Sequence, residues 1–241
     1  RSRFADAAGF TFFLVGTFDL DSIRPLVQRY LGNLPTAGTP DKASDRGITR
    51  PAGVVERTVR KGIEPKGQTA LVFTAPSTAS RQERFALDAL GEILEIRLRE
   101  ELREELGGTY SVSVVASAAR IPRPEATVFI SFGSAPDRAD SLVAAVFAQI
   151  DSLKANGPRA VDLAKYKETS TRSRETDLRQ NGWWLSLLAS SRREGEDPAT
   201  RFALAPELAR ITPETVRDAA RAYLNRSRYV RVTLLPEGPK P

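Results

Sequence analysis

The chain has 241 residues and a formal net charge of +6 at pH 7. Its hydrophobic fraction of 41% and charged fraction of 27% are typical of a globular protein that buries a sizeable core, which excludes a disordered tail and a disulfide-stapled miniprotein. The sequence contains no His and no Cys, which excludes the usual zinc-ligand sets, a Ser-His-Asp triad and a cysteine nucleophile.

The first part of the chain predicts a strand followed by a helix. Residues 10–15 (FTFFLV) are a short apolar run typical of a buried strand, and Gly16 ends it. Asp19 or Asp21 can cap the next helix, which would end before Gly32. Residues 35–53 lack periodicity and are rich in Pro, Gly and charged side chains, so we expect a linker there.

The rest of the chain combines strand pairs with amphipathic helices. Strands are expected at 54–61, 68–75, 110–119, 126–133 and 229–235, and helices at 80–106, 136–156, 159–180, 183–193 and 213–224. Strand pairs followed by helices predict an α+β domain, in which an antiparallel sheet carries helices packed on one face.

The apolar run near the start and the one at 229–235 are elements of the same kind. This similarity is explained if the chain begins inside one unit and ends at the close of a similar one. We therefore expect residues 1–34 to be the C-terminal strand and helix of a preceding homologous domain. Residues 35–53 would be the linker, 54–236 a complete domain and 237–241 a tail.

The most unusual local feature is the segment LREELGGTYSV at 102–112, in which a charged helix end runs through two glycines into a strand. One interpretation is structural: a glycine caps the helix and Tyr110 is a strand aromatic. The other is that the turn brings the Arg103 guanidinium and the Tyr110 hydroxyl together at the sheet edge. Both groups are donors and could bind carbonyl oxygens or a developing oxyanion. Spacing alone leaves both interpretations open.

Residues 93–112, which include this segment, resemble the C-terminal half of the insulinase/pitrilysin family of zinc metallopeptidases, and in particular its bacterial zinc protease branch. Three other parts of the chain resemble the family as well, so the resemblance covers essentially the whole chain in order. They are residues 61–66, residues 16–19 with Leu34-Pro35, and residues 229–232. It implies a metallohydrolase unit of the LuxS and mitochondrial-processing-peptidase type, the C-terminal non-zinc domain of such a protease.

The resemblance also implies how the chain would act. In the family, one unit carries an inverted H-x-x-E-H zinc motif, and a facing unit supplies an Arg and a Tyr. These bind the substrate and assist at the transition state; here they are Arg103 and Tyr110. Because this chain has no His, it lacks the motif, and alone it is expected to be inactive. It would hold no cofactor. Zinc is expected in an N-terminal half, in the same polypeptide or a separate subunit, and the substrate would be a peptide.

Two other classes of function are weighed against this one. The family is also similar to inactive partners and structural subunits of processing-peptidase-like complexes, although retention of both Arg103 and Tyr110 favours the peptidase role. The positive charge suggests nucleic-acid binding as a third hypothesis. Basic residues are interleaved with acids at 97–105, however, which favours a solvated helix face. We therefore expect no nucleic-acid partner.

The sequence also bears on location. No apolar stretch approaches the ~20 residues that a membrane-spanning helix needs, so we expect no transmembrane segment. The absence of Cys is compatible with an oxidising compartment, and the bacterial resemblance favours a periplasmic or exported protein.

The acidic cluster of Glu100, Glu101, Glu104 and Glu105 has an ordinary explanation in ion pairs with the interleaved Arg99 and Arg103. The spacing of Glu95 and Arg99 predicts an i,i+4 pair on the same helix. For Trp183 and Trp184 we expect a packing role at a helix start rather than the lining of a substrate chamber.

Overall fold

The computed structural model describes residues 4–36, 38, 40, 44–105 and 109–237. The chain divides into two compact units. The first, here called the helical unit, contains residues 1–44 and 172–203, and the second, the sheet unit, contains residues 45–171 and 204–241. The expected domain boundaries at residues 34 and 54 stay a prediction.

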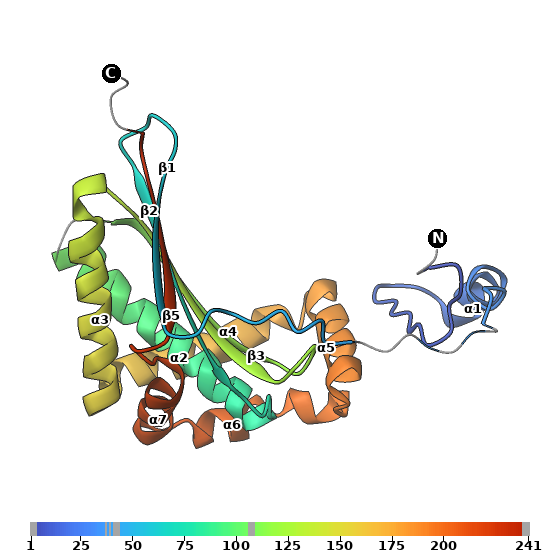
Figure 1. Cartoon of the computed structure of the whole chain (residues 1–241). Helices are drawn as coiled ribbons and strands as arrows, with labels where there is room; N and C mark the ends of the chain where they lie inside the picture. Colours follow the sequence, from blue (N-terminus) through green and yellow to red (C-terminus); the bar gives the residue numbers. More distant parts are fainter. Residues whose placement is uncertain (1–3, 37, 39, 41–43, 106–108, 238–241) are drawn as a thin grey trace. The chain divides into compact units, whose positions relative to one another are not determined.

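In the described part of the sheet unit, five strands form a sheet in the order β1-β5-β2-β4-β3 (Figure 1). The strands are β1 (Val54–Arg60), β2 (Gly67–Pro76), β3 (Thr109–Ala119), β4 (Glu125–Ser134) and β5 (Tyr229–Leu235). β2 pairs antiparallel with β4 and β5, and β3 pairs antiparallel with β4. The α+β class is confirmed. The edge strand β1 differs from the expected antiparallel pattern because it runs parallel to β5.

Helices α2, α3 and α7 pack against one face of this sheet (Figure 1). The helices of the chain from α2 onward, apart from α5, are α2 (Arg81–Arg99), α3 (Ala139–Asn156), α4 (Ala160–Asp177), α6 (Leu204–Arg210) and α7 (Pro213–Tyr223). The prediction of one α-helix over 80–106 is wrong at its end, because a π-helix (Glu100–Glu105) follows α2 directly. The short helix α6 was not predicted, since seven residues are too few for a clear periodic pattern.

The core lies between α2 and the sheet. Leu87, Leu90 and Leu94 of α2 are fully buried, as are Leu71 and Ile130 of the strands opposite. Full burial of one such side chain contributes about 1.5–3 kcal/mol. This layer fixes the position of α2 along the sheet.

A glycine in α2 allows the helix to approach the edge strand closely. A methyl group at Gly91 would lie 3.1 Å from the Cβ atom of Ala116 in β3. A larger residue at position 91 would therefore separate α2 from β3, the two elements that lead into and out of the Gly-Gly segment.

The second face of the sheet carries partly exposed apolar side chains. Val115, Phe129, Val232 and Leu234 alternate along their strands with core residues and are between 38% and 56% exposed. This alternation is what a sheet covered on one face by helices requires.

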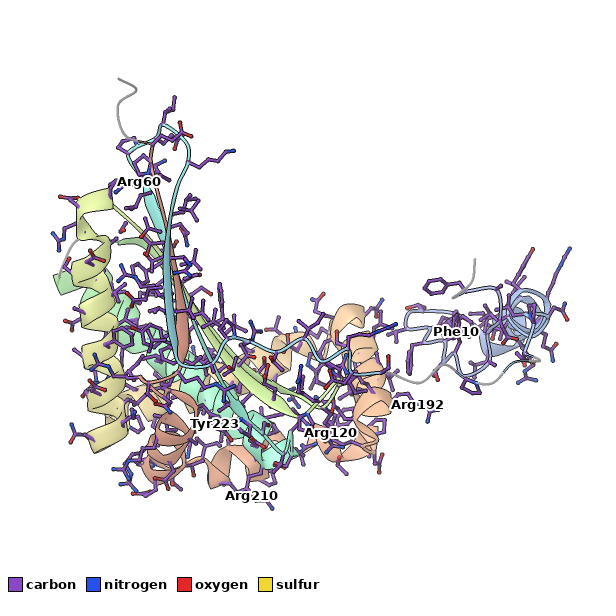
Figure 2. The ribbon with its side chains drawn as sticks, viewed as in Figure 1. Phe10, Arg60, Arg120, Arg192, Arg210 and Tyr223 are labelled. Atoms are coloured by element: carbon purple, nitrogen blue, oxygen red, sulfur yellow. The ribbon has the colours of Figure 1, made fainter. Side chains whose placement is uncertain are left out.

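In the helical unit, α1 (Leu20–Tyr30) begins at Asp19, whose carboxylate accepts a hydrogen bond of 2.8 Å from the backbone N–H of Ser22. Capping by Asp19 is thus confirmed. The predicted strand at 10–15 is wrong for this chain, because the segment has no ladder partner among the described residues. Phe10 (labelled in Figure 2) and Phe12 are 43% and 47% exposed.

The same unit contains α5 (Asn181–Glu194) and a short 3₁₀ helix (Pro198–Phe202). The rings of Trp183 and Trp184 lie 5.1 Å apart, and Trp184 and Phe202 are separated by the same distance. The guanidinium of Arg174 lies 4.9 Å from the centre of the Trp183 ring. Both tryptophans are half-buried, so they form a packed aromatic cluster, as expected.

The first turn of α2 is tied to α7 through a carboxylate. Glu83 accepts hydrogen bonds from the backbone N–H of Thr78 (2.9 Å) and from the hydroxyl of Tyr223 (2.5 Å; Tyr223 is labelled in Figure 2). Burial alone would raise the pKa of Glu83, but hydrogen bonds from Thr78, Tyr223 and Ser77 together lower it to about 2.

This lowered pKa predicts a pH-dependent stability. Since the folded pKa lies below the ordinary value of 4.5, the ionised Glu83 stabilises the fold above that pH, and the contribution is lost as the pH falls toward about 2. Glu83→Gln should therefore lower the midpoint of urea unfolding at pH 7 and change it little near pH 2.5. A difference between variant and wild type that is the same at both pH values would contradict this prediction.

Candidate functional site

The candidate site lies where α2 ends and β3 begins. Arg103 belongs to the π-helix that extends α2, and Tyr110 is the second residue of β3. Gly107 and Gly108, which connect them, and the side chains of both candidate residues lie outside the described part of the structure. The interpretation that the two donors converge therefore stays a prediction, while the backbone and the surroundings of the site are described.

The backbone at Tyr110 departs from regular pairing. Thr109 pairs with Ser134 and Val112 with Phe132, so the register of β3 against β4 shifts between Thr109 and Val112. A register shift of this kind redirects side chains locally, and such irregularities are common beside active sites. Tyr110 thus lies in the stretch where the register of the described β3–β4 ladder shifts.

A partly buried hydrogen bond connects α2 to β3 just beyond this irregularity. Glu95 of α2 accepts a 2.9 Å hydrogen bond from the backbone N–H of Val114, and its other carboxylate oxygen pairs with Arg99. The predicted i,i+4 pair of Glu95 and Arg99 is confirmed. This hydrogen bond therefore holds β3 to α2 at Val114.

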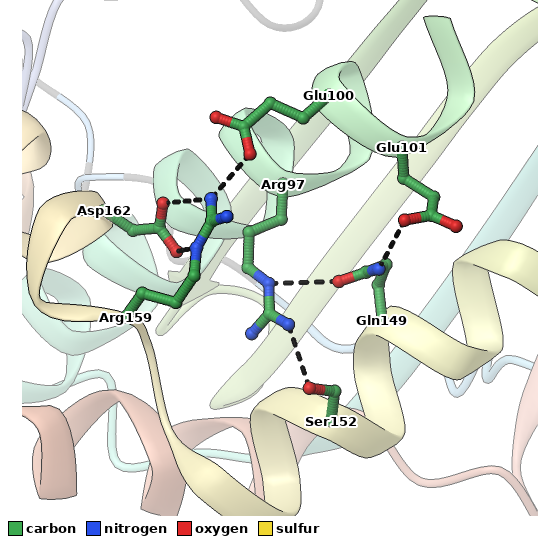
Figure 3. A network of polar contacts seen from close by, with 7 residues as sticks. All are labelled: Arg97, Glu100, Glu101, Gln149, Ser152, Arg159 and Asp162. Carbon is green, nitrogen blue, oxygen red and sulfur yellow. Dashed lines mark hydrogen bonds and ion pairs between the residues drawn. The ribbon is translucent and has the colours of Figure 1, made fainter. Parts of the chain in front are cut away.

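The π-helix is also held by hydrogen bonds from α3 and from Arg159, the residue before α4 (Figure 3). Glu101 accepts a hydrogen bond of 2.9 Å from the side-chain amide of Gln149 in α3. The carbonyl oxygen of that same amide accepts a 3.0 Å bond from Nε of Arg97, and Arg97 also donates to the Ser152 hydroxyl at 2.9 Å. Gln149 therefore links α2 and the π-helix to one turn of α3.

Glu100 has a different partner. Arg159, which immediately precedes α4, donates to Glu100 at 2.6 Å and to both carboxylate oxygens of Asp162 at 2.6 and 2.8 Å (Figure 3). Asp162 is 1% exposed and lies in the first turn of α4. Hydrogen bonds to Asp162 and Glu100 raise the pKa of Arg159, so this guanidinium stays charged.

The first two residues of the acidic cluster thus bind side chains from other parts of the sheet unit. Glu100 binds Arg159 and Glu101 binds Gln149, while the predicted partner Arg99 pairs with Glu95 and the side chain of Arg103 lies outside the described residues. Ion pairing as such is confirmed for Glu100. The side chains of Glu104 and Glu105 lie outside the described residues. Burial lowers the pKa of Arg97, while the carboxylates around it act in the opposite direction.

Nothing in the described residues fits a zinc ion. The chain supplies no imidazole or thiolate, and its described carboxylates do not gather in groups of three or more. The helices that the structure describes include none that is long and apolar enough to cross a membrane.

An open pocket of about 570 Å³ lies elsewhere in the sheet unit, between the loop after β2 and α7. Glu83 and Tyr223 line it, but their polar atoms bond to each other and Glu83 also bonds to Thr78. The pocket thus has its polar groups engaged in holding α2 to α7.

Sequence reasoning missed Gln149, Arg159 and Asp162. Arg159 lies 59 residues from Glu100, and Gln149 lies 48 residues from Glu101. The local sequence gave one signal, namely that Arg159 and Asp162 lie three residues apart at a predicted helix start. Such a pair is typical of ordinary capping.

These features define a domain class. The sequence matches the family described as the peptidase M16 inactive domain over residues 2–170, a range that includes four of the five described strands and the candidate residues Arg103 and Tyr110. The chain belongs to this family. The resemblance to the insulinase/pitrilysin metallopeptidases, and the expectation of a non-zinc domain of such a protease, are thereby confirmed.

The relatives are zinc proteases by name. The chain is 27% identical over 230 residues to the probable zinc protease PqqL of Escherichia coli, covering 93% of this chain and 24% of PqqL. The crystal structure of this periplasmic protease superposes with a TM-score of 0.74 and 26% identity, over 92% of this chain and 25% of that one. The chain thus spans about a quarter of the length of PqqL.

The same fold occurs a second time in PqqL. The structure of the first half of that protease matches this chain with a TM-score of 0.71, at 15% identity and over 90% of this chain and 49% of that half. At this identity the similarity concerns the fold alone.

Proposed function

We propose that this chain is the substrate-binding, non-zinc portion of a zinc metalloendopeptidase that encloses and hydrolyses peptides. The observation that carries the proposal is the family match over residues 2–170 in a chain that has no His and no Cys. Such a domain can contribute substrate contacts but not the imidazole or thiolate ligands of a usual zinc site.

Within this proposal, Arg103 and Tyr110 act as donors. The Arg103 guanidinium holds a backbone carbonyl of the peptide, and the Tyr110 hydroxyl donates a hydrogen bond to the oxyanion that develops at the scissile carbonyl. The π-helix and the irregular start of β3 support this role, because both are deviations from regular structure that recur at functional sites.

The partner is a zinc-bearing half, in the same polypeptide or in a separate subunit, which supplies the metal and its chemistry. The presence of the same fold in the first half of PqqL supports a partner of related architecture. The periplasmic location of PqqL supports a periplasmic or exported location here.

The N-terminal residues fit this arrangement. No side chain among the described residues of 4–36 is fully buried, and residues 10–15 have no ladder partner. We propose that residues 1–34 complete a preceding homologous domain, where 10–15 add a strand to its sheet. Residues 35–53 would then be the linker and 54–236 the complete domain.

Reconstitution tests the proposal. A quenched fluorescent peptide library is incubated, with zinc present, with this chain alone, with the zinc-bearing half alone, and with both. We expect cleavage only when both parts are present, and loss of cleavage after a chelator is added. A stable complex with no cleavage would instead support the alternative function, an inactive or structural subunit.

A further inference from the structure

We propose that Glu100 and its partner Arg159, together with Gln149, are positioning residues for the donor pair. They act by fixing the π-helix that carries Arg103. The inference rests on the proposed function of Arg103 and Tyr110, but it is drawn from side chains that the structure describes.

The first step is that three consecutive residues of the π-helix each have a tertiary partner. Glu100 binds Arg159, Glu101 binds Gln149, and Leu102 is fully buried in the core. Arg103 is the next residue. A backbone fixed at three successive positions leaves the following residue little freedom in direction, so the place of Arg103 depends on these contacts.

The second step is that the partners of Glu100 are themselves fixed. Arg159 forms a two-pronged pair with the buried carboxylate of Asp162, and the pair joins the turn before α4 to its first helical turn. One turn later, the hydroxyl of Tyr166, 2% exposed, donates a 3.0 Å hydrogen bond to Asp88 of α2. The start of α4, whose neighbour Arg159 binds Glu100, is thus also bonded to α2 through Tyr166 and Asp88.

The third step concerns the π-helix itself. A π-turn inserts a residue into a helix and rotates everything beyond it, at a cost in hydrogen-bond geometry that needs compensation. Two hydrogen bonds compensate for this cost. Arg159, just before α4, donates one to Glu100, and Gln149 of α3 donates the other to Glu101. Without them, the regular α-helical hydrogen bonding of α2 can continue and would rotate the backbone at position 103 about the helix axis.

The variant Glu100→Ala tests this role most cleanly, because it leaves the Arg159–Asp162 pair in place. In the full-length protease, we expect kcat/KM for peptide cleavage to fall about tenfold or more, mainly through a higher KM, since small displacements of a positioning group have effects of this size. Glu100→Gln keeps an acceptor for Arg159 and should recover much of the loss. Asp137→Ala is the matched control, because it removes an exposed carboxylate distant in the sequence and should leave KM unchanged.

Two further measurements separate the possible failures. Amide hydrogen exchange at residues 101–105 of the same full-length variants should speed up about tenfold or more in Glu100→Ala and stay at the wild-type rate in Asp137→Ala. Arg103→Ala is assayed in parallel. If Arg103→Ala lowers kcat/KM while Glu100→Ala changes neither KM nor exchange, the positioning role is wrong. If Arg103→Ala has no effect, the proposed function itself is wrong. A variant that merely unfolds more easily would reduce the active fraction without changing KM.

Discussion

Replacing Tyr110 with Phe in the full-length protein should reduce kcat for peptide cleavage by a factor of about 10²–10³. This is the usual effect of removing one hydrogen-bond donor from a developing oxyanion. Because the hydroxyl acts mainly on the transition state, KM should change much less than kcat. The phenyl ring remains, so the substitution removes the hydroxyl alone. Steady-state kinetics with a fluorescent peptide measure both parameters.

Replacing Arg103 with Ala should act differently. A guanidinium that holds a ground-state carbonyl through a charge-assisted hydrogen bond contributes about 1.5–3 kcal/mol, so kcat/KM should fall about 10- to 100-fold, with much of the loss in KM. Lys at this position should restore part of the binding, since it keeps the charge but not the planar fork.

Matched controls exist for both substitutions. Tyr229→Phe removes a hydroxyl that bonds to Glu56 on β1, and Arg57→Ala removes an exposed guanidinium from the same strand. Neither should change kcat or KM. If Tyr110→Phe and Arg103→Ala cleave peptides as well as these controls do, the two donors have no role in the reaction, and the inactive-subunit alternative is favoured.

The largest expected effect on stability is that of Arg159→Ala. It leaves the carboxylate of Asp162, which is 1% exposed, without the guanidinium that binds both its oxygens. Removing one partner of a buried pair costs about 3–5 kcal/mol. We expect about 3 kcal/mol, because half of the Arg159 side chain is exposed and water can partly replace it. Urea unfolding of the chain measures the loss.

A double variant separates the buried charge from lost packing. Arg159→Ala combined with Asp162→Asn removes the unpaired charge and should be more stable than Arg159→Ala alone. Arg217→Ala is the control, since its partner Asp218 is 63% exposed and this ion pair should contribute less than about 1 kcal/mol. Equal losses for Arg159→Ala and Arg217→Ala would show that the Asp162 carboxylate does not depend on its partner.

Much of the fold follows from local pattern. The strand at 229–235 was predicted to the residue, and α7 begins at Pro213 after its predicted cap, Thr212. These elements have short, unambiguous periodicity and clear end signals. The helix from residue 80 was also predicted, but its change to a π-helix at Glu100 was not, because the apolar periodicity continues through this point and gives no local signal of the change.

The remaining differences between prediction and structure depend on contacts between segments distant in the sequence. The continuous apolar run at 10–15 is typical of a buried strand, but a strand also needs a neighbouring edge, which the described part of the chain does not offer. The parallel pairing of β1 with β5 joins segments 175 residues apart in register, from Val54 to Tyr229. For the site, spacing singled out Arg103 and Tyr110 as one of two interpretations and the family resemblance favoured it, whereas Arg159 could be found only once the helices were packed.

The central claim is that this domain brings Tyr110 and Arg103 to the reacting carbonyl of a peptide held by a zinc-bearing half. The most direct test is a structure of the full-length protein with a phosphinic peptide, whose tetrahedral phosphinate mimics the oxyanion. We expect the Tyr110 hydroxyl about 2.7–3.1 Å from a phosphinate oxygen and the Arg103 guanidinium on a neighbouring peptide carbonyl. A bound phosphinate with both side chains directed away from the peptide would contradict the account.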